Sequence, residues 1–289
     1  MRHTIFLLFI PFFVVSCNSQ NSIERIIDIK YAEVNNTNLL LDIYLPSHIK
    51  NPNMVVWVHG GGWVCGDKNN PPIEIVNKGY ALASVNYRLA TEAQFPAQIF
   101  DIKAAIRFLR AKASEYQYNA ENIVIAGSSA GGHLAALVGV TNNTPDLEGT
   151  LGDYLDTSSA VQGIVDFYGP ANLLTILNQS TPHSMKVRVP ALKKLLGDLP
   201  EKRTELAKLA SPVFHVDDTD PPLLIMHGNQ DLQVPIDQSH ELENEYKKHH
   251  LEVQFKVIYD GGHGGPKLET QENYDITCKF LDKIFKVNS

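Results

Sequence analysis

The feature that most constrains the fold is the alternation of strand-length apolar runs with helical patterns along most of the chain. The runs are "MVVWVHG", "ALASVNYR", "NIVIAG", "VQGIVDFYG", "PLLIMHG" and "VQFKVIYDG". Apolar residues recur at helical spacing over 95–116, after the paired serines at 128–129, over 237–250 and over about 274–286. This alternation predicts an α/β fold, with a mostly parallel sheet covered by helices on both faces. Functional side chains are then expected at the carboxyl ends of the strands.

Two segments depart from this alternation. Near the start, "IIDIKYAEV" and "NLLLDIYLP" are β-like and are joined by the turn-prone "NNTN", which predicts a hairpin. Residues 173–216 are polar and punctuated by prolines, and we expect short helices there that form an excursion over the site. The chain has 289 residues, 44% of them apolar, and no internal repeat. One catalytic domain over 27–289 is the simplest interpretation.

The first residues, "MRHTIFLLFIPFFVVSCNSQ", have the pattern of an export signal. Arg2 precedes an apolar run over 5–15, which has the length of a secretory core and is too short for a transmembrane helix. The run ends in "VVSC", which resembles a bacterial lipobox. The sequence therefore predicts a signal peptide over 1–16, lipidation of Cys17 and a linker over 17–26; an ordinary signal peptide is the alternative. Both interpretations place the protein outside the cytoplasm, and the lipoprotein places it in the bacterial cell envelope.

Charge and cysteine usage exclude several classes of partner. The formal net charge is −7 and the cations are scattered, so nucleic acid is not expected as a partner. The other cysteines, Cys65 and Cys278, are interpreted as separate buried thiols, with a disulfide as the alternative. No CxxC and no His/Cys cluster with zinc spacing occurs, so no metal is expected.

The pentapeptide "GSSAG" follows a strand-like run and precedes a helical pattern. Gly127 and Gly131 flank Ser129 at the G-x-S-x-G spacing of a nucleophile elbow, where a sharp turn needs residues without a Cβ. Ser129 is then the candidate nucleophile, while Ser128 is expected to pack at the strand end. The alternative is a glycine-rich turn that merely packs or holds a phosphate at the helix amino terminus.

A second glycine motif, "HGGGW" at 59–63, follows the strand "MVVWV". A tetrahedral oxyanion requires several N–H donors that converge on one point, and consecutive glycines let the backbone approach closely. Gly61 and Gly62 are the preferred donors, ahead of Gly60. The N–H of Ala130, beside the candidate nucleophile, is the third donor.

A serine nucleophile also needs a base and an acid that orients the base. "LLIMHGNQDLQVP" places Asp231 just after a strand, and "FKVIYDGGHGG" places His263 after the last strand. Both residues are therefore expected at the same sheet edge as Ser129. The rival acids are Asp260, which is too close in sequence to His263, and Asp237, which is interpreted as a helix cap. Seven of the other histidines are assigned elsewhere. His59 and His227 are expected to brace their loops, and His249 and His250 to lie in solvent. His133 belongs to the elbow helix, and His183 and His215 belong to the excursion.

Taken together, the motifs "HGGGW", "CGDK", "NYRLATEAQFPAQIFDIKAAIRFLR", "GSSAGGHLAAL", "PPLLIMHGNQDLQVP" and "GGHG" resemble those of α/β-hydrolase esterases. The chain is most similar to the bifunctional feruloyl and acetyl xylan esterase-like (BD-FAE-like) family, which is related to hormone-sensitive-lipase-like esterases. The resemblance covers about 27–285 and implies the α/β-hydrolase fold, whose triad order Ser, Asp, His is the order found here. Hormone-sensitive-lipase-like enzymes carry a helical cap before HGGG, and we do not expect that cap in this chain. An open active-site cleft is therefore expected. Gln230, Gly264 and Gly265 depart from the residues common in the family, which affects substrate preference.

The sequence thus predicts a serine carboxylic ester hydrolase that uses neither metal nor cofactor. Ser129 would attack the ester, His263 would transfer protons, and Asp231 would orient His263. The expected substrates are acetyl or feruloyl esters of carbohydrates, or small short-chain esters, and the membrane is contacted only through the lipid anchor. The alternatives are an exported peptidase or amidase of the same fold, such as one resembling prolyl oligopeptidase or kynurenine formamidase, and a non-catalytic binding protein.

Overall fold

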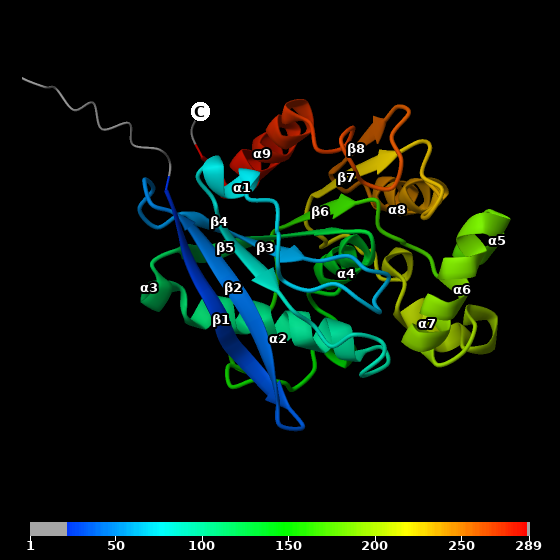
Figure 1. Cartoon of the computed structure of the whole chain (residues 1–289), viewed down its shortest axis with the longest axis horizontal. Coiled ribbons are helices and arrows are strands. Elements are labelled where there is room, and N and C mark those ends of the chain that lie inside the picture. Colours follow the sequence, from blue (N-terminus) through cyan, green and yellow to red (C-terminus); the bar gives the residue numbers. More distant parts are fainter. Residues whose placement is uncertain (1–21, 288–289) are drawn as a thin grey trace, which may run out of the picture.

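The computed structural model describes residues 22–287, and an eight-stranded sheet runs through their centre (Figure 1). The sheet order is β1-β2-β4-β3-β5-β6-β7-β8. The β1–β2 and β2–β4 pairs are antiparallel, and the other pairs are parallel. The strands are β1 (Ile23–Val34), β2 (Thr37–Pro46), β3 (Asn53–Val58), β4 (Ala81–Val85), β5 (Asn119–Ser128), β6 (Gly163–Phe167), β7 (Leu223–Gly228) and β8 (Val253–Ile258). The expected mostly parallel sheet and its opening hairpin are confirmed.

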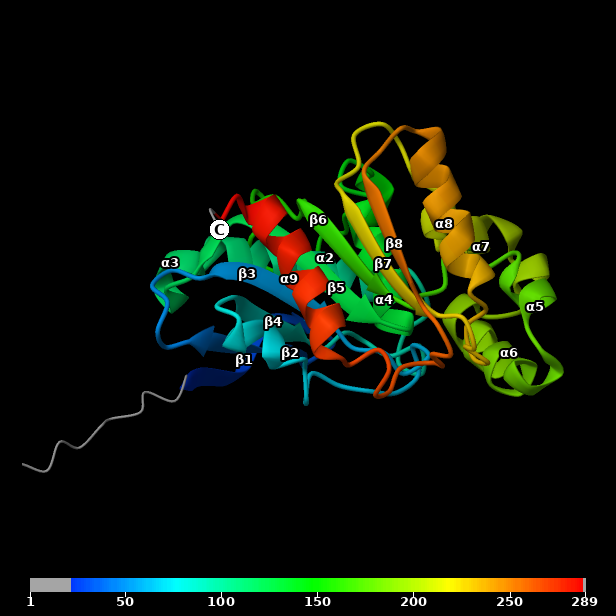
Figure 2. The same ribbon diagram turned by 90° about the horizontal axis from the view of Figure 1, so that it is seen from above.

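Helices cover both faces of this sheet, as the α/β pattern predicts (Figure 2). The two core clusters show which helix packs where: α2, α4 and α8 contribute to one, and α1 and α9 to the other. The helices are α1 (Glu74–Asn77), α2 (Ala97–Ala111), α3 (Ala113–Tyr116), α4 (Ala130–Gly139), α5 (Ile176–Gln179), α6 (Pro182–Leu196), α7 (Thr204–Leu209), α8 (Asp237–Lys248) and α9 (Gln271–Phe285). Helix α9 begins three residues earlier than expected, because Thr270 accepts a hydrogen bond from the Asn273 N–H (3.2 Å) and caps it there.

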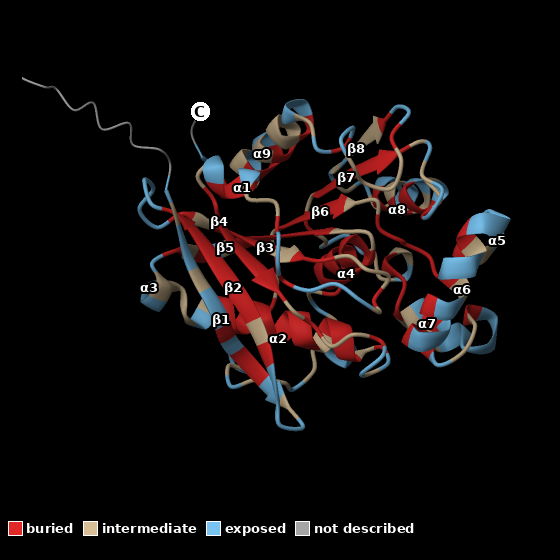
Figure 3. Cartoon of the chain, in the orientation of Figure 1, coloured by how far each residue is buried: buried red, intermediate tan, exposed pale blue. Residues whose placement is uncertain are grey.

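Strand β3 shows how the sequence distributes its side chains between the two faces. Met54, Val56 and Val58 belong to one core cluster, while Val55 belongs to the other and Trp57 packs against that second cluster. Successive side chains of a strand point to opposite faces, so an uninterrupted apolar run is what a strand buried on both faces requires. Figure 3 shows the buried interior of the sheet between the helical layers.

The excursion at 173–216 contains more regular structure than expected. It holds α5, α6 and α7, which gather at one end of the molecule (Figures 1 and 2). The expectation of short helices was wrong for α6, which has 15 residues and accommodates Pro190 in its interior. Thr181 caps its start by accepting from the Ser184 N–H (3.2 Å), and Gly197 ends it in the left-handed conformation.

Candidate active site

The link from β5 to α4 is a sharp turn with Ser129 at its apex. Ser129 has φ 55° and ψ −120°, a strained conformation for a residue with a Cβ. Its N–H donates to the Phe167 carbonyl oxygen (2.8 Å), which fixes the turn against β6. A Cβ on Gly127 would lie 2.3 Å from the Gly131 oxygen, and one on Gly131 would lie 2.0 Å from the Val58 oxygen. Both flanking glycines are therefore required by close backbone contact.

The parallel register brings the loops after β5, β7 and β8 together at one edge of the sheet. There the Ser129 Oγ lies 2.8 Å from His263 Nε2, and His263 Nδ1 lies 2.7 Å from Asp231 Oδ2. The other oxygen of Asp231 accepts from the N–H groups of Gln233 (2.7 Å) and Val234 (2.9 Å). The structure thus places the three predicted side chains in one hydrogen-bonded chain.

A second histidine, His227, also reaches the Asp231 carboxylate. Its Nε2 lies 3.2 Å from Asp231 Oδ2 and 3.0 Å from the Val234 carbonyl oxygen, so this nitrogen is the donor. Its Nδ1 lies 2.7 Å from the Ser239 hydroxyl. Burial disfavours ionisation of Asp231, but hydrogen bonds from His227 and His263 outweigh it and hold the pKa of Asp231 below its ordinary value. His227 braces its loop as expected, and it also helps keep the acid ionised.

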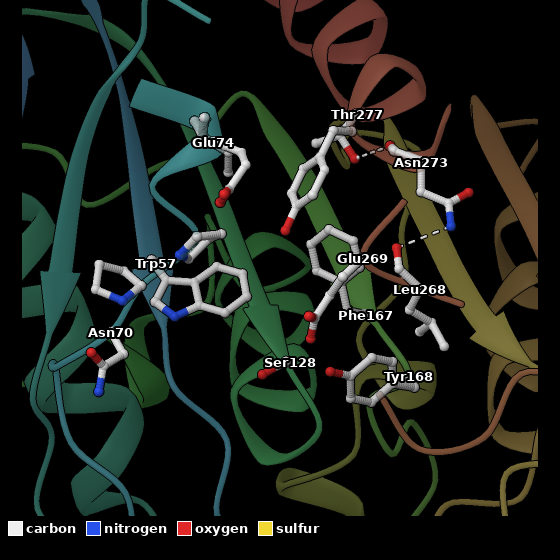
Figure 4. Close-up of a pocket in the computed structure, with 14 residues that line it drawn as sticks. Trp57, Asn70, Glu74, Ser128, Phe167, Tyr168, Leu268, Glu269, Asn273 and Thr277 are labelled. Atoms are coloured by element: carbon white, nitrogen blue, oxygen red, sulfur yellow. Dashed lines mark hydrogen bonds between the residues drawn. The ribbon is translucent and has the colours of Figure 1, made fainter. Parts of the chain in front are cut away.

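Tyr168 is a site residue that sequence reasoning missed. It follows β6 with φ 48°, and its ring meets the His263 ring edge-on at 4.8 Å between centroids. Its hydroxyl lies beside the hydroxyl of Ser128 (Figure 4). Burial raises the pKa of Tyr168 to about 12, so this hydroxyl stays protonated. Its position just after a central parallel strand was the signal that would have located it.

The "HGGGW" segment forms a tight loop after β3. Gly61 and Gly62 have φ values of 106° and 59°, and the Gly61 carbonyl oxygen accepts from the N–H groups of Val64 and Cys65 (both 3.1 Å). Within residues 22–287, no acceptor is found for the N–H groups of Gly61, Gly62 and Ala130. These unpaired donors on either side of Ser129 are what a site for a negatively charged oxygen requires.

Two contacts hold the glycine loop in place. His59 stacks on Tyr87 (4.4 Å between centroids), as loop bracing predicts. The buried Trp63 indole donates to His133 Nδ1 (3.1 Å), and His133 Nε2 in turn lies 2.6 Å from the Ala210 carbonyl oxygen. Burial lowers the pKa of His133 to about 4, so the ring is neutral and its Nε2–H is the donor to Ala210. This series of hydrogen bonds links the glycine loop, the elbow helix and the excursion.

Two pockets meet at Ser128 and Tyr168. One, of about 750 Å³, contains Ser129 and His263 and is bordered by the glycine loop and one side of α6. The other, of about 340 Å³, lies between β3, α1 and the start of α9. Figure 4 shows this second pocket, with Trp57, Glu74 and Glu269 directed toward its interior and Asn70 at its edge.

The remaining candidates are placed as follows. Asp260 is exposed and lies 3.6 Å from Lys267, and among the described residues it makes no hydrogen bond or ion pair with His263, which pairs with Asp231 instead. The assignment of Asp237 as a cap was wrong, because α8 begins at Asp237 without a side-chain capping bond. His183 lines the larger pocket, whereas His215 bonds to the Leu209 oxygen. Of the pair expected in solvent, His249 is only half-exposed and lies 2.7 Å from an Asp218 oxygen, and His250 is exposed.

The two downstream cysteines are separate, as expected, but they are not both buried. Cys65 is exposed beside the glycine loop and Cys278 is half-buried on α9. Ser128 ends β5 as expected, although its side chain borders both pockets rather than only packing. Across the described residues, no group of three His, Cys, Asp or Glu side chains has the arrangement of a metal site.

The predicted signal peptide and Cys17 lie outside the described residues, as do residues 17–21 of the predicted linker. The rest of that linker assignment was wrong, because β1 already begins at Ile23, where the backbone pairs with Pro46 of β2. Between residues 22 and 287, no helix has both the length and the apolar character to cross a bilayer.

The sheet order, the strained serine turn and the loops gathered at one edge define an α/β hydrolase. Comparison with known proteins then gives the family: the family model described as BD-FAE matches residues 41–246, and the chain belongs to this family. A solved structure, a truncated carbohydrate esterase from gut microbiota, superposes with a TM-score of 0.81 at 31% identity, covering 92% of this chain and 98% of that one.

Other relatives have related descriptions. A bifunctional GH43-CE protein of Bacteroides eggerthii has a TM-score of 0.81 and 32% identity, covering 90% of this chain and 35% of that one. The esterase LipC of Mycobacterium tuberculosis is 29% identical over 86% of this chain and 62% of its own length. The probable carboxylic ester hydrolase LipM of the same organism is 30% identical over 73% of this chain and 49% of its own. The chain thus spans about half to three fifths of these two relatives.

Proposed function

We propose that this protein is a serine carboxylic ester hydrolase that works through an acyl-enzyme. The observation that carries the proposal is the unbroken chain from Ser129 through His263 to Asp231, with unpaired N–H donors beside it. Many relatives in the comparisons are esterases, and the chain's family membership supports the same chemistry.

In the proposed mechanism, Ser129 Oγ attacks the ester carbonyl carbon while His263 Nε2 accepts its proton. The N–H groups of Gly61, Gly62 and Ala130 stabilise the oxyanion, and each such donor contributes about 100- to 1000-fold in rate. His263 then protonates the departing alcohol, and water activated by the same histidine hydrolyses the acyl-enzyme. Asp231 fixes the His263 tautomer, and the Tyr168 ring limits movement of the imidazole.

A fluorophosphonate probe tests this proposal, because only an activated serine reacts with it. We expect stoichiometric labelling with the adduct on the peptide that contains Ser129, located by mass spectrometry, and parallel loss of 4-nitrophenyl acetate hydrolysis. A folded protein that resists the probe would favour a binding protein of the same fold. Labelling accompanied by faster cleavage of an anilide than of the matched ester would favour the amidase alternative.

For the substrate, we propose acetyl or feruloyl esters of carbohydrates, or small short-chain esters. The second pocket supports the carbohydrate, because it combines the half-buried Trp57 ring with the polar side chains of Asn70, Glu74 and Glu269. The apolar C–H face of a sugar packs on an aromatic ring, and its hydroxyl groups donate to carboxylates. The solved relative that is described as a carbohydrate esterase also supports a carbohydrate ester as the substrate.

Replacing Trp57 with alanine is expected to act selectively on sugar esters. The ratio of kcat/KM for acetylated xylo-oligosaccharide to that for 4-nitrophenyl acetate should fall about tenfold, the equivalent of about 1.4 kcal/mol of lost ring contact. Trp57→Phe keeps a flat ring and should retain most of the ratio. Equal losses on both substrates, with an unchanged unfolding midpoint, would argue against a sugar site here.

We also propose that the chain from β1 onward forms one catalytic domain that functions outside the cytoplasm. The export pattern of residues 1–16 and the "VVSC" sequence ending at Cys17 support a lipid anchor in the cell envelope.

A further inference from the structure

The two pockets beside the candidate nucleophile have opposite charge. Lys186, Arg188 and Lys194 of α6 line the pocket that contains Ser129, and no Asp or Glu of residues 22–287 lines it. The second pocket is lined by Glu74 and Glu269 and by no described Lys or Arg. In a chain with a formal net charge of −7, three cations around one cavity are a local reversal of the overall charge.

Arg188 is the cation in this group that most requires an explanation, because it is only 8% exposed. Its Nη2 donates to the Gln233 carbonyl oxygen, and its Nε is sealed from solvent without a hydrogen-bond acceptor in the described chain. Nη1 makes no hydrogen bond within the described chain, and unlike Nε it is not sealed from solvent. The exposed part of the side chain borders the pocket, so Nη1 is the nitrogen available to a bound molecule.

The other buried cations of the described chain show what Arg188 lacks. Lys68 lies 2.7 Å from an Asp42 oxygen, and Lys103 and Arg107 both pair with Glu148. Within residues 22–287, Arg188 alone of these four buried cations has no carboxylate within 4.0 Å. Removing a cation from water without a partner is costly, so a site that retains one is suited to an anion supplied from outside.

The charge of Arg188 persists at neutral pH. Burial lowers its pKa to about 10, opposed by the negative charge of Asp231. Asp231 does not neutralise it by direct contact, because its oxygens are engaged by His263, His227 and the N–H groups of Gln233 and Val234.

We infer that the α6 pocket binds a carboxylate carried by the ester substrate, with Arg188 as its main ligand and Lys186 and Lys194 contributing positive charge. The inference rests on the proposed ester hydrolysis and deepens it. The carboxylate can belong to the acyl part, as in a hemiester of a dicarboxylic acid, or to the alcohol part, as in an acetylated uronic acid. A planar guanidinium recognises either one by the same charge-assisted hydrogen bonds.

Matched substrate pairs test the inference and distinguish the two sources. For the acyl part, mono-4-nitrophenyl glutarate is compared with 4-nitrophenyl valerate; for the alcohol part, O-acetyl galacturonic acid is compared with O-acetyl galactose. The wild-type protein should prefer the charged member of at least one pair by about 10- to 100-fold in kcat/KM, the range expected for a hydrogen bond to a charged group. Arg188→Gln should remove that preference, chiefly through a higher KM, while Arg188→Lys should retain part of it.

Lys193→Gln is the matched control, because Lys193 is exposed on the same helix and does not line the pocket. This variant should keep the charged preference. If Arg188 only positions the acid loop through Gln233, Arg188→Gln will lower kcat on charged and neutral esters by the same factor, and the inference is overturned. Equal rates of the wild-type protein on both members of both pairs would also overturn it. Hydrolysis of the neutral esters in that case would leave the proposed function intact.

Discussion

Replacing Ser129 with alanine is expected to lower kcat for 4-nitrophenyl acetate by about a millionfold, the loss seen when the nucleophile of a serine triad is removed. No other described side chain can substitute, since Ser129 Oγ is the hydroxyl that lies 2.8 Å from His263 Nε2. Steady-state rates on purified protein measure the effect. An unchanged unfolding midpoint shows that the fold is intact.

Ser128→Ala is the matched control, because Ser128 directly precedes the nucleophile. Its hydroxyl lies beside that of Tyr168 and is not hydrogen-bonded to His263. We expect it to cost less than about tenfold, consistent with one neutral hydrogen-bonding group. If the Ser129 variant kept more than about a hundredth of the wild-type rate, or the Ser128 variant were the inactive one, the assignment of the nucleophile would be wrong.

Much of the fold was predictable because the sheet is buried on both faces. Each parallel strand must then be an uninterrupted apolar run, and the runs containing Val55 and Val124 are recognisable without knowledge of their partners. The turn at Ser129 was predictable for a similar reason. A Cβ on Gly127 or Gly131 would lie less than 2.5 Å from a backbone atom, so a local constraint leaves a local pattern in the sequence.

The site residues that were missed depend on contacts between distant segments. Arg188 reaches the acid loop from a helix whose course no local pattern specifies, and Tyr168 matters only because β6 lies beside β7. Whether a single residue is buried also depends on contacts with distant segments. Cys65 was expected to be buried, yet it is exposed in a loop whose course is fixed by Gly61 and Gly66.

The assignment of the acid leads to the second large expected effect. Asp231→Asn should lower kcat about ten-thousandfold on the same ester. The amide retains the shape of the carboxylate, but it presents an NH2 group where His263 Nδ1–H needs an acceptor, and it cannot stabilise the imidazolium that forms during attack. Asp260→Asn is the control with the same chemical change at an exposed aspartate, and it should stay within twofold of wild type.

The same substitution should also change stability, in a direction set by the pKa of Asp231. Because that pKa is below its unfolded value, ionised Asp231 stabilises the native state above about pH 4, and this contribution is lost as the pH falls further. Asp231→Asn should therefore lower the free energy of unfolding at pH 7 by about 1 to 3 kcal/mol, with a smaller difference from wild type in strong acid. Urea unfolding at both pH values measures this, and a deficit that grows in acid would contradict it. Since His227 also donates to this carboxylate, the deficit includes the weakening of a buried hydrogen bond, whereas the rate loss reports mainly on His263. The two measurements together separate the structural role of Asp231 from its catalytic one.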